Sequence, residues 1–424
     1  MNHLIIFVLS SLVFINAQVY EGYTLFTPMS AFDDDATTYF MNNDFDILHT
    51  WTHDQGPASM PYLLQDSSII YPYRVAFPTM VAGGVGGGIQ KQSWDGEILW
   101  EYEFANEQYQ HHHDVEPLPN GNILIIVWEK KTAQEAYDMG RDTIGNPLNV
   151  MWSSAILELE PESGEIVWEW HIWDHTVQDV NSELSNFGII SEHPELFDIN
   201  CGSVGNDAGG PQGANADWMH INAIHYNSIL DQIVISSRTQ NEIFILDHST
   251  SAEEVSGHSG GNSGMGGDFL YRWGNPENYG RGSADDKILG WQHSVNWIDT
   301  NYPGGGNLII FNNVHFEGEN IWGSTDFQHH ITRTCTVYGS IGNKVKLMLF
   351  GRVLLHIVDN VQFNILILTT YKICLECFWI YVVLKSQINT GIFLTVQNII
   401  AFILCYVLPK FLLNVSKTGV TLDG

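Results

Sequence analysis

Four segments of the chain share one alternation of apolar and polar positions. Each begins with a short apolar strand, continues through a turn of Asn, Asp, Gly or Pro, and ends in a second strand rich in β-branched residues. This pattern is typical of a β-hairpin. The four predicted hairpins are residues 60–74, 113–129, 220–238 and 293–313.

A second unit recurs between the hairpins. A strand ends, a D-G or S-G turn follows in the two clearest copies, and the next strand carries a tryptophan. Because strand pairs alternate in this way with no long helical period, we predict an all-β fold, a β-propeller of four-stranded blades with about four blades visible. We expect the tryptophans to pack between blades. The copies are residues 45–54 (Trp51), 93–103 (Trp100), 161–173 (Trp168) and 269–276 (Trp273).

Three histidines occupy the same position in successive hairpins. His113, His220 and His293 each open a hairpin, at a place that faces the central channel of a propeller. We therefore expect three imidazoles to converge. Arg238 closes the strand that returns beside His220, and Arg74 holds the same position in the first hairpin. Such a pocket is cationic and exchanges protons. The alternative is a metal site, because three imidazoles can also bind a metal ion.

Aromatic and glycine-rich stretches lie near the same rim. Trp218 and Trp291 are candidate walls of an aromatic substrate pocket, with packing in the core as the alternative reading. The run GGVGGG at residues 83–88 lacks the strand and helix context of a dinucleotide loop, so we interpret it as a flexible connection. Residues 257–267 are likewise expected to form a loop.

The charge of the chain narrows the range of its partners. The 424 residues carry a formal net charge of -31, and only 9 basic side chains lie in the first 326 residues. Nucleic-acid affinity depends on clustered Lys and Arg, which excludes nucleic acid as a partner. An anionic substrate must be met by the few local cations.

The two ends of the chain differ from its middle. Residues 1–17 are predicted to be a secretory signal cleaved after Ala17, which implies a secreted or periplasmic protein. Residues 326–424 do not match the repeats: after residue 326 there are 3 acidic and 8 basic side chains, and a single tryptophan. We interpret this tail as a frameshift or read-through. The alternative is a membrane anchor at residues 391–408, which contain no charge.

Several motifs in the remaining domain, residues 18–325, together resemble the arylsulfate sulfotransferase family, whose members act independently of PAPS. The resemblance implies a six-bladed propeller that transfers a sulfuryl group from an aryl sulfate to a phenol and needs no cofactor or metal. The motifs are HHDVEPLPNGN (112–122), DWMHINAI (217–224), SSR (236–238), NEIFILDHST (241–250), GDFLYRWGNP (267–276) and QHSVNWI (292–298).

The resemblance also implies a role for each site residue. His293 is expected to be the nucleophile that is transiently sulfurylated, with His220 and Arg238 binding the sulfuryl oxygens. His113 joins them and is favoured over His112 because it is in register with the other histidines. His112, Arg74, Trp218 and Trp291 are predicted to contact the substrate.

The sequence departs from the family pattern in two places. No matching hairpins follow residue 315, so the predicted propeller is incomplete, and Trp291 is inserted before Gln292. Two other functions fit the same repeats. One is a quinone- or metal-dependent oxidoreductase on a similar propeller, and the other is a secreted binding propeller without catalytic activity.

Overall fold

The computed structural model describes residues 22–28, 35–210, 213–302 and 304–314, together with the strands at 334–338 and 346–349. Within these residues no helix is long and apolar enough to cross a membrane. The predicted signal at residues 1–17 and the candidate anchor at residues 391–408 lie outside the described residues.

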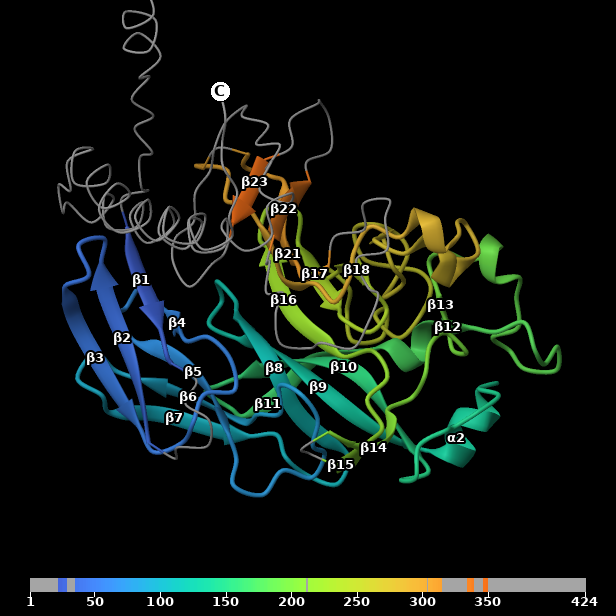
Figure 1. Cartoon of the computed structure of the whole chain (residues 1–424), viewed down its shortest axis with the longest axis horizontal. Coiled ribbons are helices and arrows are strands. Elements are labelled where there is room, and N and C mark those ends of the chain that lie inside the picture. Colours follow the sequence, from blue (N-terminus) through green and yellow to red (C-terminus); the bar gives the residue numbers. More distant parts are fainter. Residues whose placement is uncertain are drawn as a thin grey trace, which may run out of the picture. The chain divides into compact units, whose positions relative to one another are not determined.

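The fold is all-β, and four antiparallel four-stranded sheets are arranged as a β-propeller (Figure 1). All four predicted hairpins are present, and each forms the first two strands of a sheet. The sheets are β4 (Tyr62–Leu63), β5 (Ile69–Arg74), β6 (Gly87–Gln92) and β7 (Ile98–Glu103); β8 (Tyr109–Pro117), β9 (Ile123–Thr132), β10 (Val150–Glu160) and β11 (Glu165–His171); β16 (Ile221–Asn227), β17 (Gln232–Ser237), β18 (Glu242–Asp247) and β19 (Tyr271–Trp273); and β20 (His293–Trp297), β21 (Leu308–Asn312), β22 (Thr334–Tyr338) and β23 (Lys346–Leu349).

Smaller elements complete the described part of the chain. They are a three-stranded sheet of β1 (Tyr23–Phe26), β2 (Ala36–Asn42) and β3 (Ile47–His53), the pairs β12 (Thr176–Val177) with β13 (Phe197–Asp198) and β14 (Asn206–Gly210) with β15 (Gly213–Asn215), the helix α2 (Ala133–Asp138), and the 3₁₀ turns η1 (Ile172–His175), η2 (Ile190–Glu192), η3 (Pro276–Tyr279) and η4 (Ala284–Asp286).

The central strands carry runs of apolar residues because both of their faces are buried. Successive side chains of a strand point to opposite faces. In β9, Ile125 and Val127 pack with the first sheet, whereas Ile126 and Trp128 pack with the third. In β17, Val234 likewise faces the fourth sheet and its neighbours face the second. Each interface between blades is therefore a separate apolar cluster, and each fully buried aliphatic side chain contributes about 1.5–3 kcal/mol.

Trp168, one of the four repeat tryptophans, lies between blades, as the sequence predicts. Trp168 and Trp170 of β11 are both almost fully buried. The Trp168 indole donates to Thr250 Oγ1 at 3.1 Å, and the Trp170 indole donates to the Gly267 carbonyl at 2.8 Å. Both acceptors belong to the segment between β18 and β19, so these side chains connect the second and third blades.

The predicted start of the tail at residue 326 falls inside the fourth sheet. β22 pairs with β21, and β23 pairs with β22. The fourth sheet therefore takes strands from beyond residue 315, and the prediction that no hairpin matching the repeat follows that residue stays a prediction. Two of its four strands come from the segment that the repeat pattern assigns to the tail.

Candidate active site

The three repeat histidines lie on, or directly before, the first strands of three consecutive blades. His113 is part of β8, His220 immediately precedes β16, and His293 is the first residue of β20. β16 contacts both β8 and β20. Because these first strands are neighbours, side chains that leave them on the same side reach one space.

A break in strand pairing accompanies each histidine. The register of β8 with β9 shifts between His111 and Val115, and similar shifts follow His220 in β16 and His293 in β20. His113 and His220 adopt positive φ values of 57° and 48°. Positive φ is uncommon for a residue with a Cβ, and such residues occur in turns and at functional sites. A bulge of this kind redirects a side chain, here toward the cavity.

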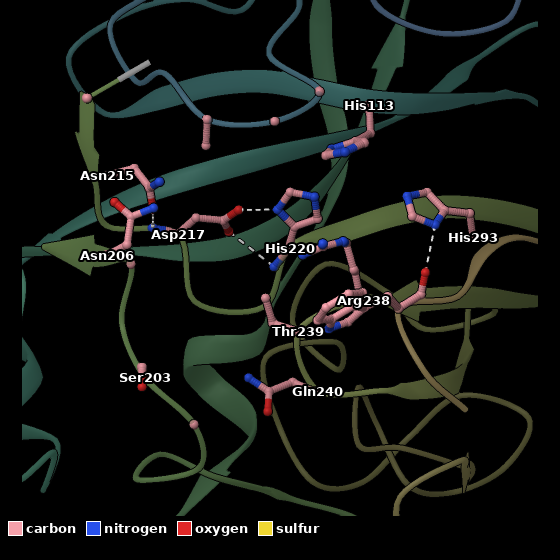
Figure 2. Close-up of a pocket in the computed structure, with 17 residues that line it drawn as sticks. His113, Ser203, Asn206, Asn215, Asp217, His220, Arg238, Thr239, Gln240 and His293 are labelled. Atoms are coloured by element: carbon pink, nitrogen blue, oxygen red, sulfur yellow. Dashed lines mark hydrogen bonds and ion pairs between the residues drawn. The ribbon is translucent and has the colours of Figure 1, made fainter. Parts of the chain in front are cut away.

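The histidines open into a cavity of about 680 Å³. Figure 2 shows the rings of His113, His220 and His293 directed toward a common space, with the Arg238 side chain beside them. This volume suits a small organic ligand. The remaining lining residues are Ala82, Gly83, Gly84, Gly202, Ser203, Gly205, Asn206, Gly213, Asn215, Asp217, Thr239, Gln240 and Trp291.

His220 is held by an aspartate that sequence reasoning overlooked. Its Nδ1 lies 2.5 Å from Asp217 Oδ2, and its backbone N–H donates to Asp217 Oδ1 at 3.1 Å (Figure 2). The same oxygen accepts the indole N–H of Trp128 at 3.0 Å. A carboxylate at Nδ1 orients the ring and leaves Nε2 to exchange protons. The sequence signal that could have found this contact is the three-residue spacing of Asp217 and His220 in the DWMH motif. In a loop, two side chains at that spacing can reach each other.

Hydrogen bonding also defines the tautomer of His293. Its Nδ1 lies 2.9 Å from the Trp291 carbonyl, which can only accept a hydrogen bond. The proton of the neutral ring is therefore on Nδ1, and the lone pair is on Nε2. The Asn313 amide is 3.2 Å from the same Nδ1. The contacting atom is the amide nitrogen Nδ2, which donates, so the assignment of the proton to Nδ1 rests on the shorter contact to Trp291.

Arg238 brings a permanent positive charge to the cavity. Its backbone N–H donates to the His220 carbonyl at 3.1 Å, so the two residues are neighbours at one end of the hairpin. Burial lowers the pKa of Arg238 and the Asp217 carboxylate raises it. The guanidinium lies over the Trp291 ring, 5.0 Å from its centroid. Such a cation–π contact fixes the direction of the guanidinium without neutralising its charge.

His113 is a neutral imidazole at ordinary pH. Burial is the main reason that the pKa of His113 lies well below its usual value, and the neighbouring His220, His112 and His293 lower it further. The rings of His113 and His220 meet edge to face at 4.6 Å between centroids. A neutral ring at this place can donate one hydrogen bond to a ligand without requiring a counterion.

The other predicted contact residues are divided between the cavity wall and the core. Trp291 lines the cavity. His112 lies behind it, with Nδ1 2.8 Å from His113 Nδ1 and its ring stacked on Trp128. Trp218 is fully buried and its indole donates to the Cys201 carbonyl at 2.8 Å, so it packs in the core. Arg74 occupies the predicted position at the end of β5 but is not a lining residue.

The glycine run at residues 83–88 is part of the site and not a flexible connection. Gly87 and Gly88 begin β6, and Gly83 and Gly84 line the cavity. Gly84 has φ +77°, and a Cβ there would lie 2.2 Å from the His113 ring. The run therefore lets backbone approach the histidines. The sequence did not predict this role, because the close approach of a glycine backbone to a distant side chain produces no sequence pattern.

The side chains whose geometry suits a metal ion lie outside the cavity. In the part of the chain that the structure describes, one group of His, Cys, Asp or Glu side chains brings three ligand atoms within 4.8 Å of one another, and it contains none of the cavity histidines. The reading of His113, His220 and His293 as a metal site is not favoured by their geometry.

The arylsulfotransferase (ASST) family model matches residues 78–335, and this range includes all three histidines and Arg238. The chain belongs to the arylsulfotransferase family. Its members act on small aryl substrates, and the propeller is the fold of this family. The search of curated proteins found no match.

Solved structures resemble this arylsulfotransferase family member only distantly. A protein of unknown function from Bacteroides caccae is 12% identical, with a TM-score of 0.33, and the match covers 69% of this chain and 65% of that one. The hydrazine synthase of Kuenenia stuttgartiensis is 12% identical, with a TM-score of 0.36 and coverages of 68% and 67%. The chain thus spans about two thirds of the length of each.

Replacing Gly84 by alanine should displace the His113 ring, because the new Cβ overlaps it. We expect the kcat of arylsulfotransferase turnover to fall about 100-fold, the scale of misplacing a group in an active site by about 1 Å. Gly121→Ala is the matched control, since Gly121 has φ +95° and a Cβ there would meet nothing within 4 Å. Equal kcat values for the two variants would contradict the assigned role of Gly84.

Proposed function

We propose that the protein transfers a sulfuryl group from an aryl sulfate to a phenol through a sulfuryl-His293 intermediate. The observation that carries the proposal is the convergence of His113, His220, His293 and Arg238 on one cavity in a member of the arylsulfotransferase family. Family membership also favours group transfer over the redox and binding alternatives.

Substrate binding follows from charge. An aryl sulfate is an anion, and the chain as a whole carries a charge of -31. The Arg238 guanidinium offers directional donors for sulfuryl oxygens, and such preorganised donors stabilise developing charge without rearranging during the reaction. His113 adds a neutral donor. The Trp291 ring, which already contacts Arg238, provides a flat surface for the aryl group.

In the first half-reaction, the lone pair of His293 Nε2 attacks sulfur. The bond from sulfur to the phenolic oxygen breaks as the sulfur–nitrogen bond forms, and the electron pair leaves with the phenolate. The Trp291 carbonyl keeps the Nδ1 proton in place while positive charge develops on the ring. His220, in its protonated form, gives its Nε2 proton to the departing oxygen.

In the second half-reaction, the roles reverse. Neutral His220 removes the proton of the acceptor phenol, and the resulting phenolate attacks the sulfur of sulfuryl-His293. The sulfur–nitrogen bond breaks and its electron pair returns to Nε2. Asp217 is a positioning residue in both halves, because its carboxylate orients His220 and stabilises the protonated ring.

The test is intact-mass measurement of the purified full chain before and after brief exposure to 4-nitrophenyl sulfate. We expect an adduct with the mass of one SO₃ group that maps to His293 and disappears when phenol is added. Turnover without an adduct on any histidine would overturn the covalent route, and absence of both turnover and adduct would overturn the proposed function.

A further inference from the structure

A second cluster of histidine and carboxylate lies outside the cavity. His175 ends the turn η1, whereas His258 and Asp268 belong to the segment between β18 and β19. One ligand atom from each residue lies within 4.8 Å of the other two. His175 is fully buried, Asp268 is nearly so, and the His258 side chain is 60% exposed.

Both imidazoles contact the same carboxylate oxygen. Nδ1 of His175 lies 2.7 Å from Asp268 Oδ1, and Nδ1 of His258 lies 2.8 Å from it. The opposite nitrogen of His175, Nε2, is 2.9 Å from the Val255 carbonyl. Three atoms that can bind a metal, the two Nδ1 nitrogens and Asp268 Oδ1, therefore lie close together, with both nitrogens in contact with the one oxygen.

The position of the His175 proton decides what this arrangement requires. A carbonyl only accepts, so the hydrogen bond to Val255 places the proton of neutral His175 on Nε2. Nδ1 then presents a lone pair to a carboxylate oxygen 2.7 Å away. Two acceptors at this distance repel each other in a buried place unless a positive charge lies between them. The contact therefore needs either one additional proton between His175 Nδ1 and Asp268 Oδ1 or one metal ion.

We propose that this cluster binds a divalent transition metal of the zinc class through His175 Nδ1, His258 Nδ1 and Asp268 Oδ1. One ion satisfies all three atoms. Two imidazoles with one carboxylate suit zinc and its neighbours better than the hard cations Mg²⁺ and Ca²⁺, which prefer oxygen ligands. The Val255 carbonyl plays the part of the outer partner that usually orients a metal-bound imidazole. The exposed side of His258 gives the ion an entry path and room for water as a fourth ligand.

The surroundings give the ion a structural role. The Trp170 ring lies parallel to that of His175, with 5.8 Å between centroids, and its indole donates to the Gly267 carbonyl. A Cβ at Gly267 would come within 2.6 Å of His175 Nε2, so only glycine fits there. The glycine-rich segment 257–267 contains few apolar anchors. The ion would attach this segment of the third blade to η1, which follows the last strand of the second.

The test uses the full chain, produced without a histidine tag and freed of metal by a chelator. Zn²⁺ is titrated by calorimetry into the wild type, His258→Ala and His193→Ala. His193 is a matched control, since it is partly exposed and its Nδ1 contacts a single carboxylate, that of Glu195, at 2.9 Å. We expect His258→Ala to lose one equivalent of Zn²⁺ or to bind it at least about 100-fold more weakly. The control should bind like the wild type.

Thermal unfolding provides a second measurement that does not depend on the variants. At a hundredfold excess over Kd, Zn²⁺ should raise the Tm of the wild type by about 5 °C and leave the Tm of His258→Ala unchanged. Equal Zn²⁺ affinity in the wild type and His258→Ala, or no effect of Zn²⁺ on the wild type, would overturn the proposal. Hydrogen bonds to Asp268 alone would then hold the cluster together.

Discussion

Replacing His293 by alanine is expected to lower the rate of sulfuryl transfer by at least about 10³-fold, the scale of losing a nucleophile that acts with its partners. Two rings of the cavity, those of His293 and His220, direct Nδ1 to an acceptor, and the proposed mechanism assigns attack on sulfur to His293 and proton transfer to His220. His293 Nδ1 is committed to the Trp291 carbonyl, so Nε2 carries the lone pair. His220 is oriented by Asp217, and His113 is contacted through Nδ1 by His112.

The measurement is steady-state transfer from 4-nitrophenyl sulfate to a phenol, together with the intact mass of the protein after exposure to donor alone. His293→Ala should give neither product nor adduct, and its circular dichroism spectrum should match that of the wild type. His193→Ala, which alters a histidine outside the cavity, should keep full activity. An adduct that persists in His293→Ala would move the nucleophile to another histidine, and undiminished turnover would remove the mechanism.

Replacing His220 by alanine should have an effect that depends on the leaving group. If His220 protonates the departing phenolate, its loss should reduce kcat/KM for phenyl sulfate by about 10²–10⁴-fold. The loss should be much smaller for 4-nitrophenyl sulfate, because 4-nitrophenolate leaves readily without a proton. The comparison separates proton transfer from charge stabilisation, since weaker binding of the sulfuryl oxygens would reduce both rates alike.

Asp217→Asn provides the companion variant for this measurement. The amide still accepts the indole hydrogen bond of Trp128 and preserves the shape of the loop. It does not stabilise a protonated His220, so the same dependence on the leaving group should appear with a smaller amplitude. Equal losses with both donors in His220→Ala and Asp217→Asn would assign His220 to sulfuryl binding alone.

The fold could be predicted from the sequence because its signals are local. The period of two and the Asn, Asp and Gly turns identify each hairpin within about twenty residues, and all four hairpins form. Repetition then places His113, His220 and His293 at equivalent positions, which is enough to expect that they meet. The same reasoning selects His113 over His112 for the cavity, and the structure has His113 in the wall and His112 behind it.

Tertiary structure alone decided how the site is completed. Trp218 lies two residues before His220 and Asp217 three, yet Trp218 packs in the core and Asp217 forms the hydrogen bonds that orient His220. Arg74 and Arg238 end equivalent strands, but only Arg238 lines the cavity. Gly84 matters because of a ring that is 29 positions away. Strand periodicity constrains only which face of a sheet a side chain occupies. The approach of separate blades, and the bulges and positive φ angles that turn His113 and His220 inward, depend on contacts between segments that no local pattern connects.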